Sequence, residues 1–421
     1  MRRLRDVLTT RGRSFVAAGA TLALSGMVLG FSDLTRCGVL LVSLPVVSGL
    51  LMRRHSLRLA LERSPRPSRV AIDEPAIVTV GIENRAPTKT PLLMAEEQLD
   101  YALGDRPRFV VPPLRAGERC SVTYTVRSHI RGRHRLGPLG VRLRDPFGLT
   151  SRVGAVSGSG ELIVLPRIEP LGSGRPPGNG IGAEGAIPHM VALHGEDDVS
   201  VREYRDGDDL RRIHWPATAR TGDLMVRQED RPARRRAVIL LDSRASAHRG
   251  SGSASSFEWA VTAAASISAH LIHQRYAVHL ATAETVEDSQ VAAPLEYEQM
   301  LDVLAVAQTG RDQDLSEVLH SAHPVTGAGG LVVAILAGLT GDQARQVAAL
   351  RQPGGVGLAM ILDTDTFNGG RGPRNDVSEI TQAAAEVLHN AGWSALGVPA
   401  GRSVATVWGS LSSSSTPAGV R

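Results

Sequence analysis

The chain has 421 residues, of which 42% are hydrophobic and 21% charged, and its formal net charge is +5. This length predicts two or three domains, and the composition is typical of a folded protein. Aromatic residues make up only 4% of the chain and most arginines alternate with acidic residues, which argues against nucleic-acid binding. The two cysteines, Cys37 and Cys120, provide neither a disulfide framework nor a metal-binding spacing.

Two uncharged runs near the N-terminus, residues 14–32 and 37–52, lie between arginine-rich flanks and are separated by a polar break at Asp33 and Arg36. The first run, as a helix, would cover about 28 Å, enough for a bilayer core. Arginines on both outer flanks place both termini in the cytoplasm by the positive-inside rule. We therefore expect residues 1–63 to form a two-span transmembrane hairpin in the inner or plasma membrane. A secretory signal and a buried hairpin of a soluble domain are the alternatives.

Alternating apolar and polar residues predict a β-sandwich-like domain over residues 64–170, closed by a strand in residues 160–168. The basic segment Arg131–Pro138 favours a solvated hairpin end over a loop that binds phosphate or an acidic partner. In the segment Arg144–Leu149, a turn is expected with Gly148 at positive φ and Phe147 inserted into a core.

Residues 171–198 are rich in Gly and Pro without periodicity, which predicts a linker. They contain no phosphate-binding loop pattern. His189 and His194 lie near three acidic residues at 196–198, but a loop without further ligands at a fixed spacing does not favour a metal site.

Residues 199–232 concentrate charges around one Tyr, one His and one Trp. Asp208 is a predicted N-cap for a short helix over residues 209–215, because its carboxylate can accept from the free N–H groups of the first turn. Pro216 is expected to start a second short turn, since proline is tolerated only at a helix start. A strand is expected to begin at residues 224–226.

Residues 202–220 resemble the signature of the bacterial domain-of-unknown-function fifty-eight family. The matching positions are Arg202, Tyr204, Gly207, Asp208, Arg211, Ile213, His214, Trp215, Ala219 and Arg220. Pro216 departs from the family pattern and shortens the expected helix. The resemblance implies a membrane protein that is functionally tied to MoxR-type AAA+ ATPases and has a C-terminal region similar to a von Willebrand factor A domain.

Residues 233–410 alternate apolar strands with helical patterns, which independently predicts an α/β, Rossmann-like domain with a mostly parallel sheet covered on both faces. Residues 404–411 are expected to form a last edge strand or a tail, and residues 411–421 a disordered tail. The whole chain is thus predicted to be an α+β multidomain protein.

In von Willebrand factor A domains, which the resemblance implies, a loop of pattern D-x-S-x-S binds a divalent cation. Asp242 and Ser246 fit this pattern and are the metal-ligand candidates, but Arg244 replaces the middle serine. Arg311 stands at the expected threonine position, and residues 338–340 supply no aspartate. A guanidinium at position 244 would repel a cation and could pair with Asp242 instead. We therefore expect no metal or other cofactor.

The sequence favours a membrane-anchored, non-enzymatic scaffold or adaptor whose cytoplasmic domains bind a MoxR-type AAA+ ATPase or its client. Its expected partners also include other membrane or cell-envelope proteins and the lipid bilayer. The predicted binding residues form either an ionic and aromatic clasp against the α/β sheet or a partner site: Arg202, Tyr204, Asp208, Arg211, His214, Trp215 and Arg220. One alternative is an enzyme that uses Asp208, His214 and Tyr204 as acid and base groups, although no nucleophile motif accompanies them. The other is a metal-dependent protein-binding module.

Overall fold

The structure is a computed structural model that describes most of the chain. The described residues are 5–54, 57–172, 200–204, 213–228, 235–283, 285, 291, 293–310, 315–326, 330–368 and 377–414. The chain divides into two compact units, Met1–Arg167 with Leu301–Ala307, and Ile168–Met300 with Gln308–Arg421. Mixed α and β structure with several sheets confirms the predicted α+β class at this level.

The first unit contains two long helices followed by strands. The helices are α1 (Thr10–Leu29) and α2 (Ser32–Arg54), and a 3₁₀ turn covers Tyr101–Leu103. The strands are β1 (Arg5–Leu8), β2 (Leu59–Arg66), β3 (Arg69–Ala71), β4 (Pro75–Asn84), β5 (Leu93–Leu99), β6 (Arg108–Val111), β7 (Arg119–Arg127), β8 (Gly132–Arg144), β9 (Thr150–Val156) and β10 (Gly160–Leu165).

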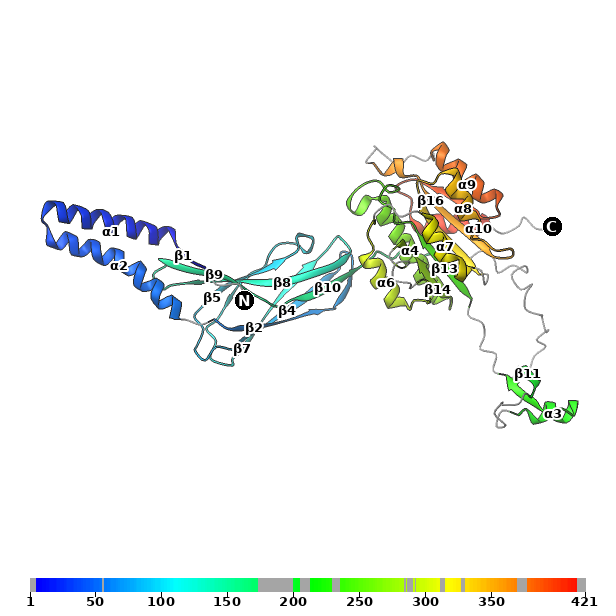
Figure 1. The fold of residues 1–421 in the computed structure, drawn as a ribbon, viewed down its shortest axis with the longest axis horizontal. Helices are drawn as coiled ribbons and strands as arrows, with labels where there is room; N and C mark the ends of the chain where they lie inside the picture. The colour runs from blue at the N-terminus through cyan, green and yellow to red at the C-terminus, as the bar shows by residue number, and fades with distance from the viewer. Residues whose placement is uncertain are drawn as a thin grey trace. The chain divides into compact units, whose positions relative to one another are not determined.

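Helices α1 and α2 lie side by side as an antiparallel hairpin (Figure 1), and both are long and apolar enough to cross a membrane by length and composition. Gly30 adopts a left-handed conformation (φ 74°), so the connection needs only two residues. The polar residues Asp33 and Arg36 do not form the connection between the helices, because they belong to the start of α2, where Asp33 suits the positive end of the helix dipole. The helices approach so closely that a Cβ built on Gly38 would lie 2.4 Å from the backbone nitrogen of Ala23.

Two sheets form the β part of this unit. One has seven strands, with the path β1-β9-β8-β10-β3, with β5 paired to β8 and β6 paired to β5, and the other has the order β2-β4-β7. Val78 and Val80 of β4 share one hydrophobic core with Leu139 and Val141 of β8, so the sheets are packed face to face. This arrangement agrees with the predicted sandwich-like domain, and β10 is the expected closing strand.

The β structure begins earlier than predicted. Strand β2 lies in the basic flank assigned to the hairpin, because Leu57, Leu59 and Leu61 alternate toward the core. Its Arg63 donates from Nε to Glu97 Oε1 at 2.7 Å, and both side chains are fully buried. Since β2 and β5 belong to different sheets, this ion pair joins the two layers of the core.

Strand β8 corrects a second prediction. Residues 132–138 do not form a solvated hairpin end, because they are the first half of the 13-residue strand β8. His134 points inward and is only 5% exposed, while its neighbours Arg133 and Arg135 are exposed. The cluster of basic residues obscured an ordinary alternation between buried and solvent-facing positions.

The turn Asp145–Leu149 ties the helical hairpin to the sandwich. Asp145 accepts hydrogen bonds from the Leu149 backbone nitrogen at 2.7 Å and from the Ser48 hydroxyl of α2. Thr9, the N-cap of α1, donates from Oγ1 to the Gly148 carbonyl at 2.6 Å, and β1 pairs with β9. Gly148 has the predicted positive φ, 69°. The expected insertion of Phe147 into a core is wrong: its side chain is 66% exposed, because the turn already packs its other face on the hairpin.

The second unit contains a small two-stranded sheet and a larger α/β arrangement. Its strands are β11 (Ser200–Glu203), β12 (Met225–Gln228), β13 (Arg236–Leu241), β14 (Ala277–Ala281), β15 (Leu331–Ala337), β16 (Val356–Leu362) and β17 (Ser394–Val398). Its helices are α3 (Trp215–Thr221), α4 (Ser256–His273), α7 (Leu315–Thr326), α8 (Gly341–Ala348), α9 (Glu379–Asn390) and α10 (Val404–Ser414), with 3₁₀ turns at Gly252–Ala254 and Thr364–Phe367. Helix α6 (Tyr297–Val306) is divided between the two units.

Five parallel strands in the order β14-β13-β15-β16-β17 form the centre of the α/β arrangement (Figure 1). Val238 and Leu240 of β13 pack in one core with residues of α7, α8 and α9. The intervening Ile239 faces the opposite side of the sheet and is fully buried, and α4 contacts β13, β14 and β15. The predicted parallel sheet between helical layers is therefore confirmed.

The C-terminal segment is helical, so the predicted edge strand or tail at residues 404–411 is wrong. Val404, Val407, Trp408 and Leu411 are all at most 2% exposed, and their spacing is that of one helix face. Helix α10 also extends to Ser414, past the predicted end of the domain at residue 410.

Candidate functional site

The carboxyl ends of β13 and β15 form the first candidate site. Strand β13 is followed in the chain by β14 on one side, whereas β15 lies on its other side, so the connections leave in opposite directions. In open α/β sheets, ligands bind outside the carboxyl ends of the strands at such a switch point. Here this position holds the loop Asp242–Arg249 and the turn Gly338–Thr340.

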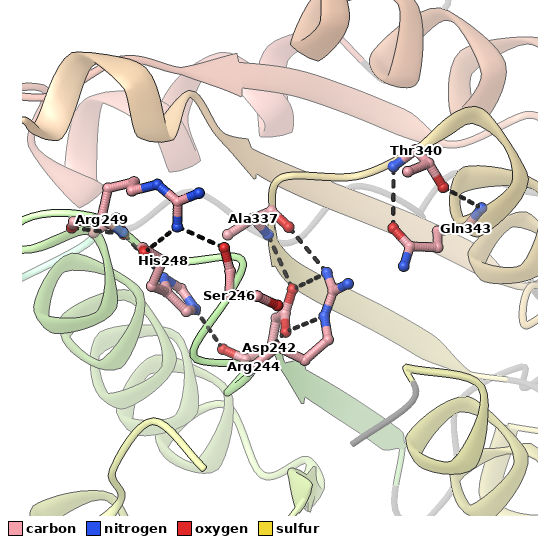
Figure 2. Close-up of polar contacts among 9 residues, drawn as sticks. Asp242, Arg244, Ser246, His248, Arg249, Ala337, Thr340 and Gln343 are labelled. Carbon is pink, nitrogen blue, oxygen red and sulfur yellow. Dashed lines mark hydrogen bonds and ion pairs between the residues drawn. The ribbon is translucent and has the colours of Figure 1, made fainter. Parts of the chain in front are cut away.

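Asp242 lies at the centre of this loop and is 2% exposed. Its Oδ1 accepts from the Arg244 backbone nitrogen at 3.1 Å and from Arg244 Nε at 2.9 Å. Its Oδ2 accepts from Arg244 Nη2 at 2.7 Å and from the Ala337 backbone nitrogen at 3.2 Å (Figure 2). Four donors therefore surround the carboxylate, and each of its oxygens accepts two hydrogen bonds.

Arg244 lies directly against the carboxylate of Asp242, the residue that the sequence suggested as a cation ligand. Its guanidinium forms a two-point ion pair with Asp242 and also donates from Nη2 to the Ala337 carbonyl at 3.0 Å. The predicted pairing of Arg244 with Asp242 is thus confirmed. The cavity beside them has a volume of about 10 Å³, about the space of one water molecule. The switch point is therefore filled by the side chains of the protein itself.

His248 stabilises the loop Asp242–Arg249 through hydrogen bonds at both of its ring nitrogens. Its Nε2 donates to the Asp242 carbonyl at 2.8 Å, and its Nδ1 forms a hydrogen bond with the Ser256 hydroxyl at 3.0 Å. The ring also packs edge-on against Phe257 at 5.1 Å. Burial lowers the pKa of His248 below its usual 6.5, and the nearby Arg244 charge acts in the same direction, against the raising effects of the Asp242 carbonyl and carboxylate. Burial therefore favours the neutral ring.

The remaining cation-ligand positions are engaged or differ from the pattern. Ser246 is exposed, and its backbone carbonyl accepts from Arg249 Nη1 at 2.6 Å. Thr340 caps α8: its hydroxyl accepts from the Gln343 backbone nitrogen, and the Gln343 side chain accepts from the Thr340 backbone nitrogen (Figure 2). Arg311 lies outside the described residues. Among the described residues, no group of three or more His, Cys, Asp or Glu is arranged to hold a metal ion.

The family-signature segment contains a two-stranded sheet and a short helix. Strands β11 and β12 are antiparallel, with Arg202 opposite Val226 and Glu203 opposite Met225. The Tyr204 backbone nitrogen donates to the Leu224 carbonyl at 2.8 Å. These contacts confirm the strand that was expected to begin at residues 224–226 and pair it with residues 200–203.

His214 has a structural position at the start of α3. Its Nδ1 accepts from the Ala217 backbone nitrogen at 3.2 Å, so it is the N-cap residue, and its own backbone nitrogen donates to the Met225 carbonyl at 2.8 Å. Pro216 lies in the first turn, as expected. Ile213 forms an isolated bridge with Val226, so the predicted helix through Ile213 is wrong at this residue. A β-bridge uses the backbone groups that a helix would have needed.

The predicted binding residues are only partly described. Trp215 is 66% exposed, Arg220 is exposed, and Tyr204 and His214 are half-buried. Asp208 and Arg211 lie outside the described residues, so the clasp stays a prediction. No hydrogen bond links Tyr204 to His214 within the described part of the segment. Sequence reasoning missed His248, because only the packing of Ser256 and Phe257 distinguishes it from other histidines.

Taken together, the described parts define an α+β protein with an apolar helical hairpin, a two-sheet β structure and a parallel α/β sheet whose switch point is internally closed. Residues 200–352 match the model of the family described as "Protein of unknown function DUF58". This match supports the family resemblance of residues 202–220, and it includes both the signature segment and the loop around Asp242.

Comparison with curated proteins found no match. Among solved structures, the CARDB domain of the PF1109 protein from Pyrococcus furiosus has 17% identity and a TM-score of 0.20, covering 26% of this chain and 93% of that one. The alkylpurine DNA glycosylase AlkC from Pseudomonas fluorescens has 16% identity and a TM-score of 0.20, covering 32% and 39%. A β-glucosidase from Listeria innocua has 17% identity and a TM-score of 0.17, covering 26% and 16%. At these TM-scores, none of the likenesses bears on the function of this chain.

Proposed function

We propose that this protein is a membrane-anchored, non-enzymatic scaffold or adaptor that binds a MoxR-type AAA+ ATPase or its client. The observation that carries the proposal is the Arg244–Asp242 pair, because it fills the one position where an α/β sheet of this order ordinarily binds a ligand. Because the described residues leave only about 10 Å³ beside this pair, we expect binding to occur through the surface of the protein. The MoxR-type partner follows from the family resemblance, which the match over residues 200–352 supports.

We further propose that α1 and α2 cross the membrane and that both termini are cytoplasmic. Around the hairpin tip, Leu24, Met27 and Val28 are 65%, 69% and 80% exposed, which suits lipid better than water. Strand β1 pairs with β9, so the chain before the hairpin and the β structure after it lie at the same end. The arginine-rich flanks are at that end too, which favours the cytoplasmic side.

The α/β sheet is proposed to act as a von Willebrand factor A-like domain that has lost metal dependence. Arg244 would supply permanently the positive charge that a cation supplies in a metal-dependent loop. Trp215 is the preferred contact residue for the partner, because an exposed tryptophan is a frequent binding hot spot.

The test is a pull-down of a purified MoxR-type AAA+ ATPase from the same source with the full-length protein in detergent. We expect Trp215→Ala to lower the amount of retained ATPase about tenfold or more. Tyr101→Ala is the matched control, because Tyr101 is an 84% exposed aromatic residue outside the family match, and it should have no effect. Equal retention by wild type and Trp215→Ala would contradict Trp215 as the contact, and failure of the wild type to retain the ATPase would contradict the partner.

A further inference from the structure

A groove of about 690 Å³ lies between α2 and the sandwich, entirely within the first unit. One wall is the side of α2 from Leu40 to Met52. The other wall consists of Pro91, Leu92 and Met94 and of the end of β8 with the turn that follows, Arg142–Phe147. The same turn anchors the hairpin through Asp145 and Ser48, so the groove has a fixed geometry.

The apolar wall continues into the segment that we propose to be membrane-spanning. From Leu40 to Met52, α2 extends over about 18 Å along its axis. Leu40, Val47 and Leu51 are each more than half exposed on this wall, and Leu92 on the opposite wall is 57% exposed. A hydrocarbon chain in the adjacent leaflet could therefore enter the groove without crossing water.

Two positively charged arginine side chains line the sandwich side of the groove. Arg142 and Arg144 are exposed and alternate with the buried Val141 and Leu143 along β8, so both arginines project from the same face of the strand. Among the described residues, neither forms an ion pair or side-chain hydrogen bond. The carboxylate among the lining residues, Asp145, is 8% exposed and already accepts from Ser48 and from the Leu149 backbone nitrogen. The charge presented to a ligand is therefore positive.

We propose that this groove binds one anionic phospholipid, with an acyl chain along α2 and the phosphate on Arg142 and Arg144. The proposal rests on the proposed membrane anchoring of α1 and α2. An amphiphile matches the combination of an apolar wall and two guanidinium groups, whereas a purely apolar helix would leave both cations without a counter-charge. Guanidinium groups bind phosphate oxygens with paired hydrogen bonds, and the cytoplasmic leaflet supplies anionic lipids. Phe147, exposed at the rim, is the kind of residue found at membrane–water interfaces.

The decisive experiment measures phospholipid binding to the full-length protein in detergent by native mass spectrometry, with phosphatidylglycerol and phosphatidylcholine as probes. We expect one phosphatidylglycerol to bind with at least tenfold higher affinity than phosphatidylcholine. The double variant Arg142→Ala/Arg144→Ala should lose this preference. The matched control is Arg133→Ala/Arg135→Ala, which removes the same charge from the same strand outside the groove and should retain it.

A second pair of variants tests the acyl-chain wall. Val47→Trp fills the groove and should weaken phosphatidylglycerol binding at least tenfold. Leu24→Trp adds the same bulk to an exposed position on α1 that does not line the groove, and it should bind as wild type does. Circular dichroism and gel filtration must show that each variant is folded. If one groove variant does not fold, the lipid preference of the wild type and the result from the other groove variant still test the lipid-binding proposal.

Equal binding of the two lipids, or unchanged binding by both groove variants, would overturn the proposal. Membrane fractionation of the intact chain separates this failure from failure of the membrane anchoring. If the chain stays in the alkali-washed membrane pellet but shows no lipid preference, only the groove proposal fails. If the chain is recovered in the soluble fraction, the membrane anchoring fails first.

Discussion

At the carboxyl end of β13, Arg244 is 12% exposed in its side chain and is held by a buried carboxylate, whereas Arg142 and Arg144 beside α2 are exposed and present their charge outward. The difference follows from desolvation, because a buried charge is tolerated only when it is paired, and an exposed charge needs no internal partner. One arginine therefore closes a potential ligand site and the other two leave a site open. In both places the sequence has arginine near apolar residues. The extent of burial determines whether the arginine closes a site or leaves it open.

The strongest test of the closed site is Arg244→Ala. It leaves Asp242 buried without its counter-charge, and we expect a loss of about 3–5 kcal/mol in the free energy of unfolding. Denaturant unfolding followed by tryptophan fluorescence checks this value, because all four tryptophans, at positions 215, 259, 393 and 408, lie in the second unit.

Arg345→Ala is the control for that measurement. Arg345 pairs with Asp342 on the surface of α8, where the two side chains are 68% and 83% exposed, so its loss should cost less than about 0.5 kcal/mol. The double variant Asp242→Asn/Arg244→Met should recover part of the stability, since it removes both charges. If Arg244→Ala and Arg345→Ala lost similar amounts of unfolding free energy, the proposed stabilisation by the buried pair would be contradicted.

The wall of the open groove depends on how closely α1 and α2 pack. Gly38→Ala places a Cβ 2.4 Å from the Ala23 backbone nitrogen, so the helices must separate, and we expect a loss of about 1–3 kcal/mol in hairpin stability. Gly49→Ala, also in α2, would meet only a methyl group of Thr150 at 3.8 Å and should be neutral or slightly stabilising. Hydrogen exchange of residues 10–54 in the detergent-solubilised chain measures both effects. Equal protection in the two variants would refute this close packing.

The parallel sheet and the Arg244–Asp242 pair could be predicted from the sequence because their signals are local. Each buried strand is a continuous apolar run, and the two charged residues are only two positions apart. Strand β1 could not be predicted, because Arg5–Leu8 becomes a strand only by pairing with β9, about 145 residues later. The exposed position of Phe147 likewise depends on the docking of Ser48 on Asp145. Helix α10, by contrast, could have been predicted, because Val404, Val407, Trp408 and Leu411 follow a helical period. The prediction of a strand or tail failed because Val and Trp also favour strands.

Protonation of His248 should weaken the closed site at low pH. Because burial lowers its pKa in the folded state below 6.5, the unfolded chain binds more protons in the window between that lowered value and about 6.5. The full stability is therefore present above about pH 6.5 and decreases as the pH falls through this window, by at most about 1.4 kcal/mol per pH unit for one histidine.

Tryptophan-monitored unfolding from about pH 7.5 to about pH 5.5, roughly one unit either side of the reference value of 6.5, measures this slope. His248→Asn should make it shallower, and the residual slope should include His279, whose pKa is also lowered by burial. His320→Asn changes an exposed histidine of α7 and should leave the slope unchanged. A wild-type stability that does not decrease from pH 6.5 downward would contradict the proposed neutral state of His248.

The smallest expected effect is that of Mg²⁺ on the closed site. Because Asp242 already accepts four hydrogen bonds and the guanidinium of Arg244 lies against it, a cation would have to displace a bound positive charge before gaining a ligand. We expect calorimetry of the full-length protein to give no binding heat with Mg²⁺ or Mn²⁺, and millimolar Mg²⁺ to leave the unfolding midpoint unchanged. A micromolar affinity that Asp242→Ala abolishes would show instead that the guanidinium moves aside. Arg244 would then differ from Arg142 and Arg144 in having to move before a ligand can bind.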